Sequence, residues 1–428
     1  MSREIKIRSR FLIFFILLGI GLFNHSSRVL AQDSPVPNEP GQLWLLIDQA
    51  RLRNPEIIAA TKKLEALQQE IQQEKAWEDP EFTLTQYEAP SNLDLSHPAQ
   101  TWYGLGQSFS FPGKRALKGK IAEKEAEYQY EMLQTTIREV VFKLKSAYYR
   151  QFFASKGINI HLAHQTLLEE FTRSAQQKYA AGFGSQQEIV KAEVELSKLH
   201  NSLLALEEDK IEAETTLNAI LNQPADVFLE TSEEPENTEF KHTLEELIPS
   251  ALKNRPELLA ANLQIQKKGI SLSLAEKYIY PDFMAELTYM ESHKGEENKW
   301  MAIAKMNLPW IFNHKYQAKI RQIRLEKEET EAELKGIENK TLAELRILHS
   351  KIKSLEKSLN MYRNGILPQA EQSLKASQIA YQSGKTDLLN VIDSERTLKD
   401  LEMNYFETLV DFNQRISELE KLTGKDLN

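Results

Sequence analysis

Two histidines with a metal-binding spacing are the most chemically suggestive residues of this 428-residue sequence. His161 and His164 are about one helical turn apart, so both rings could face one metal ion. A zinc site needs three or four ligands, and nothing near these histidines completes such a set. We therefore interpret both as solvated helix residues and predict no metal site.

No other motif predicts enzymatic chemistry. Gly113-Lys114-Arg115 contains a basic residue but lacks the spaced glycines of a phosphate-binding loop. Four further histidines are isolated in the sequence, namely His242, His293, His314 and His349. We predict no catalytic residues and no cofactor, and therefore a protein that is not an enzyme.

The first 31 residues predict export from the cytoplasm. A basic stretch at 1–10, an apolar run at 11–23 and Val29-Leu30-Ala31 form the pattern of a secretory signal cleaved after Ala31. A membrane anchor is the alternative, but the apolar run is shorter than the roughly 20 residues that span a bilayer. The chain has no cysteine, which excludes disulfides and a lipid on an N-terminal cysteine. The net charge of −9, with acids and bases interspersed, argues against nucleic acid as a partner.

The chain repeats itself at an offset of 201 residues. Leu46 to Glu56 matches Leu247 to Glu257, and Asp79-Pro80-Glu81-Phe82 matches Tyr280-Pro281-Asp282-Phe283. We predict a signal peptide (1–31), an N-terminal extension (32–43), a first repeat (44–222), a linker (223–243), a second repeat (244–424) and a C-terminal tail (425–428).

Each repeat contains a pair of alternating segments that predict a β-hairpin. We expect strands at 82–89 and 101–111 in the first repeat, and at 283–291 and 299–308 in the second, so that the hairpins cover 82–111 and 283–309. Apolar residues share one side of each strand, for example Tyr103, Leu105 and Phe109. Strands of about 9–11 residues with this pattern also form outer-membrane barrels. A hairpin in a water-soluble sheet is the alternative.

Long helical hairpins follow the strands. Helices over 113–180 and 312–382 would each be roughly 100 Å long, which no globular core requires. A heptad seam runs through Leu345, Leu348, Ile352, Leu355, Leu359 and Tyr362. Glycine-containing turns at Tyr179–Ser185 and Tyr381–Asp387 would reverse each chain into an antiparallel coiled coil.

Four strands cannot close a barrel, and an open edge cannot lie in lipid because its backbone groups would be unpaired. Two chains would supply eight strands, which leave an interior filled by side chains, whereas three would supply twelve and leave a lumen. Pro112, Gly113 and Pro309 would then mark the change from barrel wall to helical wall. Lys114 and Arg115 would lie where the membrane interface meets water, with an ordinary solvated helix start as the alternative.

The doubled Asn54-Pro55-Glu56 and Arg255-Pro256-Glu257 openings, Phe-Pro-Gly-Lys-Arg at 111–115 and the paired Tyr-x-x-Gly turns resemble the TolC-like outer membrane efflux proteins. The resemblance covers about residues 43–424, and the 111–115 motif looks most like the heavy-metal branch. It implies a homotrimer with a 12-strand barrel in outer-membrane lipid, a helical tunnel in the periplasm, a periplasmic adaptor (membrane fusion) protein and an inner-membrane pump.

The resemblance also implies roles for residues at the two helical turns. The adaptor would dock on Tyr179, Gly182, Ser185, Tyr381, Gly384 and Asp387. Positions that carry acidic side chains at the tunnel mouth of the family correspond to Asn390 and Asp393. Asn390 departs from the acidic pattern, which leaves Asp393 as the candidate for a ring of three carboxylates.

We therefore expect a mainly α protein with membrane β-strands, internally duplicated, that acts as the passive exit duct of a tripartite efflux or type I secretion system. The sequence does not name the cargo: the 111–115 motif suggests heavy-metal cations, and drugs or proteins are the alternatives. The alternative is a secreted coiled-coil scaffold of the periplasm, with hairpins in water.

Overall fold

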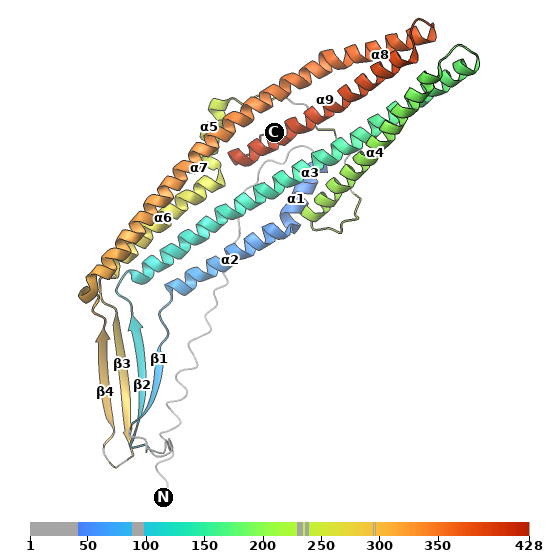
Figure 1. Ribbon diagram of the computed structural model, residues 1–428. Helices are drawn as coiled ribbons and strands as arrows, with labels where there is room; N and C mark the ends of the chain where they lie inside the picture. Colours follow the sequence, from blue (N-terminus) through green and yellow to red (C-terminus); the bar gives the residue numbers. More distant parts are fainter. Residues whose placement is uncertain are drawn as a thin grey trace. The chain divides into compact units, whose positions relative to one another are not determined.

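The computed structural model describes residues 42–87, 98–228, 234–235, 239–293, 295 and 297–427. The chain divides into a unit of residues 1–40 and a unit of residues 41–428, and the second unit is described below (Figure 1). The predicted signal peptide and most of the N-terminal extension lie outside the described residues. Parts of the predicted linker lie outside them too, so the domain boundaries stay predictions.

The order of elements in the second unit occurs twice. The first half contains α1 (Gln42–Arg53), α2 (Pro55–Lys75), β1 (Glu81–Tyr87), β2 (Gln100–Phe109), α3 (Lys114–Ala180) and α4 (Gln186–Ile220). The second contains α5 (Leu244–Asn254), α6 (Pro256–Lys277), β3 (Phe283–Ser292), β4 (Lys299–Met306), a 3₁₀ turn η1 (Pro309–Phe312), α7 (Asn313–Met361), a π-helical turn η2 (Tyr362–Ile366), α8 (Leu367–Gln382) and α9 (Leu388–Thr423).

Proline begins α2 and α6, as the sequence predicted, because its fixed φ suits the first helical position. Asn54 caps α2 with its side-chain oxygen, 2.9 Å from the backbone nitrogen of Glu56. Its side-chain amide also donates to the carbonyl of Ile220 at 2.8 Å, which ties this helix start to the end of α4. At the matching place in the second half, Arg255 donates to Thr341 of α7 at 2.8 Å.

The four strands form one antiparallel sheet in the order β1-β2-β3-β4. The strands begin close to their predicted positions, but β2 and β4 end two residues early. Side chains replace backbone partners at both ends: the backbone of Phe111 donates to the Asp282 carboxylate at 2.7 Å, and the backbone of Asp282 donates to the side-chain oxygen of Asn307 at 2.7 Å. The predicted end of the first strand, at residues 88–89, lies outside the described residues.

The long helix of the second half is interrupted, which corrects the expectation of one continuous helix over 312–382. The π-helical turn η2 separates α7 from α8 just before Pro368. Proline lacks a backbone N–H and its ring clashes with the carbonyl of the residue four positions earlier, so the regular ladder cannot continue. The sequence interpretation overlooked Pro368. The helix α3, which has no proline, is unbroken over 67 residues.

The helices of the unit lie side by side and share three buried clusters. The predicted heptad seam is confirmed, because Leu345, Leu348, Ile352 and Leu359 belong to one cluster with Leu409 and Phe412 of α9. Figure 1 shows the strands at one end of the unit and the α3–α4 and α8–α9 turns at the other. Among the described residues, no helix combines the length and apolar character needed to cross a membrane.

Candidate functional site

One face of the sheet is apolar and exposed, the reverse of the arrangement in a water-soluble domain. The register aligns Leu84, Tyr103, Tyr289 and Trp300 in one row, and Phe82, Leu105, Leu287 and Ala302 in the next. Phe82 is 69% exposed and Trp300 is 67% exposed. This apolar face confirms the predicted alternation, and its size marks a surface that contacts lipid or another protein.

Aromatic residues lie at both ends of the apolar face. Tyr103 stacks on Tyr289 at 6.5 Å between ring centroids, and Tyr289 lies 5.0 Å from Trp300. Phe109 and Phe283 form the row nearest the helices. This row lies about 20 Å along the strands from the row of Tyr103 and Tyr289. Two aromatic girdles flanking an apolar band are typical of outer-membrane barrels.

The opposite face of the sheet, here called the polar face, carries charged, hydroxyl and glycine positions. Its members include Glu81, Thr83, Gly104, Gly106, Glu286, Thr288, Lys299 and Lys305. The Lys305 ammonium lies 3.2 Å from the Glu286 carboxylate. A sheet with one apolar and one polar face therefore separates an apolar medium from an aqueous one.

The strands β1 and β4 are the two edges of this sheet within the chain. Each edge strand presents a row of backbone N–H and C=O groups on the side away from its neighbour. In hydrocarbon every unpaired group costs several kcal/mol, so an apolar sheet with open edges needs another chain at both edges.

The junction between sheet and helices is fixed by an ion pair between the two halves of the chain. The Lys114 ammonium lies 2.9 and 3.0 Å from the Asp282 carboxylate oxygens and 2.9 Å from the carbonyl oxygen of Tyr280. The Lys114 side chain is 2% exposed. The alternative of a solvated helix start is wrong for Lys114, because Asp282 from the second repeat pairs with its buried ammonium. The predicted position of this junction at a membrane interface stays a prediction.

The neighbours of Lys114 serve the same junction. Gly113 adopts φ +92°, a left-handed conformation that favours glycine, directly before α3. Arg115 lies with its guanidinium 3.7 Å from the ring centroid of Trp77, a cation–π contact. Pro309 begins η1 between β4 and α7. The change from strand to helix thus occurs at the residues that the sequence singled out, although their role in a barrel remains a proposal.

The two helical turns are built alike. Gly182 has φ +78° and Gly384 has φ +70°, and each follows the last turn of a helix. Tyr381 is buried under Lys178, whose ammonium lies 3.6 Å from the ring centroid, whereas Tyr179 is exposed. Phe183 is 87% exposed, which makes it the most prominent apolar side chain at the turns. Sequence reasoning did not select Phe183, although an aromatic residue between two glycines was a usable signal.

The aperture candidates begin the returning helix α9. Asp387 caps α9 by accepting from the backbone of Asn390 at 3.2 Å, and the Asn390 side chain donates to the same carboxylate at 2.7 Å. Asp393 is 66% exposed in its side chain and pairs with Arg396, one turn later. The sequence analysis missed Arg396, which partly neutralises Asp393 and also lies 4.0 Å from Glu195 of α4.

His161 and His164 are buried, which corrects the interpretation of both as solvated residues. They lie on the face of α3 that packs against α9. His164 contacts two carboxylates: its Nδ1 lies 2.7 Å from Glu395 and its Nε2 lies 3.0 Å from Glu402. His161 binds the carbonyl of Gly157 at 2.8 Å, and burial lowers the pKa of its ring.

His164 is charged in the folded chain. Burial alone lowers the pKa of the imidazole, but the hydrogen bonds and negative charges of Glu395 and Glu402 outweigh burial and raise it to about 9. With both nitrogens protonated, the ring has no lone pair for a metal ion. Within the described ranges, no group of three or more His, Cys, Asp or Glu side chains could hold a metal.

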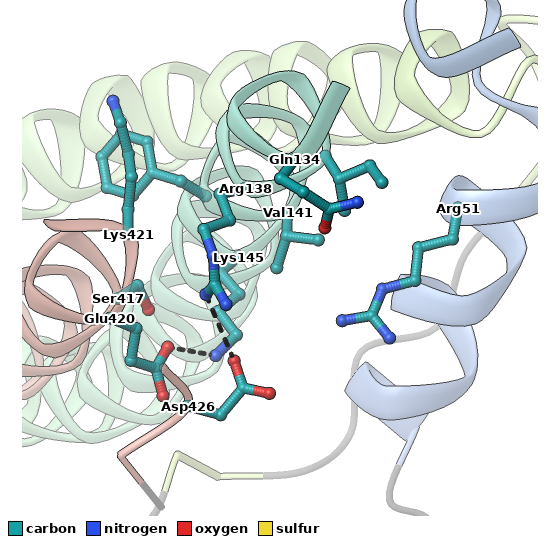
Figure 2. A pocket seen from close by; sticks show the side chains of 11 residues that line it. Arg51, Gln134, Arg138, Val141, Lys145, Ser417, Glu420, Lys421 and Asp426 are labelled. Carbon is teal, nitrogen blue, oxygen red and sulfur yellow. Dashed lines mark hydrogen bonds and ion pairs between the residues drawn. The ribbon is translucent and has the colours of Figure 1, made fainter. Parts of the chain in front are cut away.

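A pocket of about 300 Å³ lies between α1, α3 and the end of α9 (Figure 2). The Lys145 ammonium lies 2.5 Å from Glu420, and Arg138 lies 3.9 Å from Asp426. The other two basic residues of the lining are also paired, Arg51 with Asp48 and Lys421 with Glu139. Each basic residue of the lining thus has an acidic partner, and the Lys145–Glu420 and Arg138–Asp426 pairs connect the C-terminal residues to α3.

Comparison with known proteins is consistent with this geometry. A family model described as "Outer membrane efflux protein" matches residues 46–223 and 247–425. The chain belongs to the outer membrane efflux protein family.

Individual relatives of this efflux protein are distant. The cobalt-zinc-cadmium resistance protein CzcC of Cupriavidus metallidurans is 20% identical over 373 residues, 87% of each chain. The pyoverdine export outer membrane protein OpmQ of Pseudomonas aeruginosa is 25% identical over 237 residues, 54% of this chain and 49% of OpmQ. The CusC crystal structure has the same fold, with a TM-score of 0.78, 14% identity and coverage of 92% and 96%.

Family membership places this efflux protein in the outer membrane and makes its role the outward passage of substrates. The alternative of a secreted coiled-coil scaffold is therefore set aside. The exposed apolar face of the sheet gives the physical reason, because a scaffold in water would hide such a surface.

Removing the His164 imidazole should make the stability of the helical part less dependent on pH. The charged His164 stabilises the folded chain fully at pH values below the pKa of an unfolded histidine, near 6.5. This stabilisation is lost as the pH rises through the folded-state pKa of about 9. The difference between the folded and unfolded pKa values corresponds to about 3 kcal/mol of unfolding free energy per chain. Thermal unfolding of detergent-solubilised protein, followed by circular dichroism from pH 6 to pH 10, should show His164→Gln melting lower than the unmodified chain at pH 6 and approaching it at pH 10.

The matched control is His200→Gln, because His200 is exposed on α4. This variant should melt like the unmodified chain at every pH. A constant difference between His164→Gln and the unmodified chain across the range would contradict a charged His164.

Proposed function

We propose that three copies of this chain form one channel that crosses the outer membrane and continues as a helical tunnel into the periplasm. The three sheets would close a 12-strand barrel with the apolar face toward lipid and the polar face toward the lumen. Twelve strands leave an open interior, whereas eight would be filled by side chains. The channel does no chemistry itself and acts as a passive exit.

The observation that carries this proposal is the sheet with an exposed apolar face and an edge strand on each side. A closed barrel removes every edge. In a ring of copies, β1 of one chain would pair with β4 of the next, so one kind of contact repeated around an axis satisfies all edges.

The helical turns far from the sheet would receive the periplasmic adaptor of an inner-membrane pump. Tyr179, Gly182 and Ser185 of one turn, and Tyr381, Gly384 and Asp387 of the other, lie at the same end of the unit (Figure 1). The exposed side chain of Phe183 adds an apolar contact at this end. An adaptor would thereby join the tunnel to a pump that supplies energy and selects substrates.

We propose heavy-metal cations as the cargo. The support is the match to CzcC over 87% of both chains, together with the motif at residues 111–115. OpmQ, which exports pyoverdine, matches only 54% of this chain, so a chelated or organic cargo is the second candidate.

Disulfide cross-linking should capture the contact between chains, because the native sequence has no cysteine to interfere. Thr83→Cys on β1 would be combined in turn with Met301→Cys, Ile303→Cys or Lys305→Cys on β4. All four positions belong to the polar face. Oxidation in membranes should give, for at least one pair, a ladder of covalent species that ends at three chains, because only facing residues meet disulfide geometry.

Thr83→Cys alone is the control and should give no ladder. A ladder that ends at two chains would replace the proposed 12-strand barrel with an 8-strand barrel. Ladders without an upper limit, or no cross-link from any pair, would contradict a closed ring.

Charge at Asp393 should control how multivalent cations block the tunnel. If three Asp393 carboxylates face the tunnel mouth, Asp393→Asn should weaken cation block by roughly tenfold in planar bilayers, because rings of carboxylates set cation affinity in channels. Arg396→Gln should strengthen block, because it removes the basic partner of Asp393. If both variants are blocked by cations as strongly as the unmodified channel, Asp393 does not line the aperture.

Deletion of the gene should reveal the cargo. We expect sensitivity to metals such as zinc, cobalt, cadmium, copper and silver, with little change toward dyes, detergents and antibiotics. Growth would be measured across both panels, with the unmodified gene supplied in trans as the control. Sensitivity to drugs alone would refute the metal assignment and leave the channel proposal intact.

A further inference from the structure

Methionines cluster on the polar face of the sheet, although the wall of a water-filled lumen is normally lined by polar residues. Four of the eight methionines of the chain lie on β3 and β4. Met306 belongs to the apolar face, in the row of Phe109 and Phe283. Met284, Met290 and Met301 belong to the polar face, which they share with Glu286, Thr288 and Lys299.

Two of these methionines are neighbours across β3 and β4. Met290 pairs with Lys299, and Met301 pairs with Thr288, so Met290 and Met301 occupy diagonal positions. Diagonal positions are about 7–8 Å apart, within reach of two flexible thioether side chains. Met284 is set apart, since its methyl carbon lies over Gly106, where a β-carbon would be only 2.9 Å away.

An aromatic residue occupies the neighbouring position on β2. Trp102 of β2 lies directly opposite Met290 in the register. Its ring stacks on Tyr87 at 5.2 Å between centroids and 10° between planes, and its indole nitrogen donates to Gln100 at 2.9 Å. These contacts hold the Trp102 ring against β1, on the side of β2 away from the thioethers. Both methionines and Trp102 are half-buried, so they remain accessible from the polar face.

Thioether sulfur is a soft ligand that selects Cu(I) and related monovalent ions over hard divalent ions. The chain has no cysteine, so methionine provides its only sulfur ligands. Two neighbouring thioethers therefore suit a soft monovalent cation.

The geometry points to a transit site for Cu(I) or Ag(I), formed by Met290 and Met301, once in each chain. This inference rests on the proposed function, because the polar face must line the lumen for a passing ion to reach the site. Lys299, exposed and opposite Met290, places a positive charge next to the site. That charge weakens binding, and weak binding is what a conducting path requires, because an ion must leave as readily as it enters.

Silver binding to the full trimer tests the site, because this measurement does not require the tunnel to be open. Purified protein in detergent and nitrate buffer would be dialysed against silver nitrate, and bound silver measured by mass spectrometry. Met290→Leu combined with Met301→Leu should lose one silver ion per chain, or lower the affinity at least roughly tenfold, about 1.4 kcal/mol. Lys299→Gln should tighten binding several-fold.

Met306→Leu is the matched control, because it removes a methionine of the same sheet from the apolar face. It should bind silver like the unmodified chain. Equal silver binding by the unmodified protein and the double variant would overturn the site, as would an equal loss in Met306→Leu. Native mass spectrometry of the same samples reads the number of chains separately, so a trimer without silver binding refutes this site and leaves the channel standing.

Discussion

The unpaired backbone of two edge strands is the constraint on which the structure depends. An apolar sheet can lie in lipid only if every N–H and C=O group has a partner, and the strands of one chain cannot provide all of them. In the proposed assembly, other copies of the chain supply these partners at β1 and β4. The outward apolar rows and the polar face behind them follow from the same requirement, because one wall separates lipid from water.

The helical part continues that wall and holds the two halves of the chain in register. Lys114 of the first half is buried against Asp282 of the second, directly where strands become helices. A buried ammonium left without its carboxylate would be costly, so this pair fixes how the halves meet. Farther along the helices, His164 of α3 joins Glu395 and Glu402 of α9 in the same way. Charged pairs thus connect elements that are distant in sequence, while the apolar clusters pack the helices together.

Much of the fold was predictable because its signals are local. Period-two alternation predicted the strands, proline marked the helix starts at Pro55 and Pro256, and glycine marked the turns at Gly182 and Gly384. The failures concern partners far away in the chain. His164 lies 231 residues from Glu395, and nothing local distinguishes it from a solvated histidine. Asp282 could have been singled out from the sequence, because the internal repeat aligned it with Glu81. The break before Pro368 was a local signal that was overlooked.

Tryptophan fluorescence tests the central claim, that the two faces of the sheet meet different media. Trp300 lies on the apolar face and Trp102 on the polar face. Two variants would each keep one of these and replace the other four tryptophans of the chain with phenylalanine. In vesicles, brominated lipid should quench Trp300 and leave Trp102 bright, while iodide in the buffer should quench Trp102 more than Trp300. Equal quenching of both by iodide, with no effect of brominated lipid on Trp300, would contradict a lipid-facing sheet.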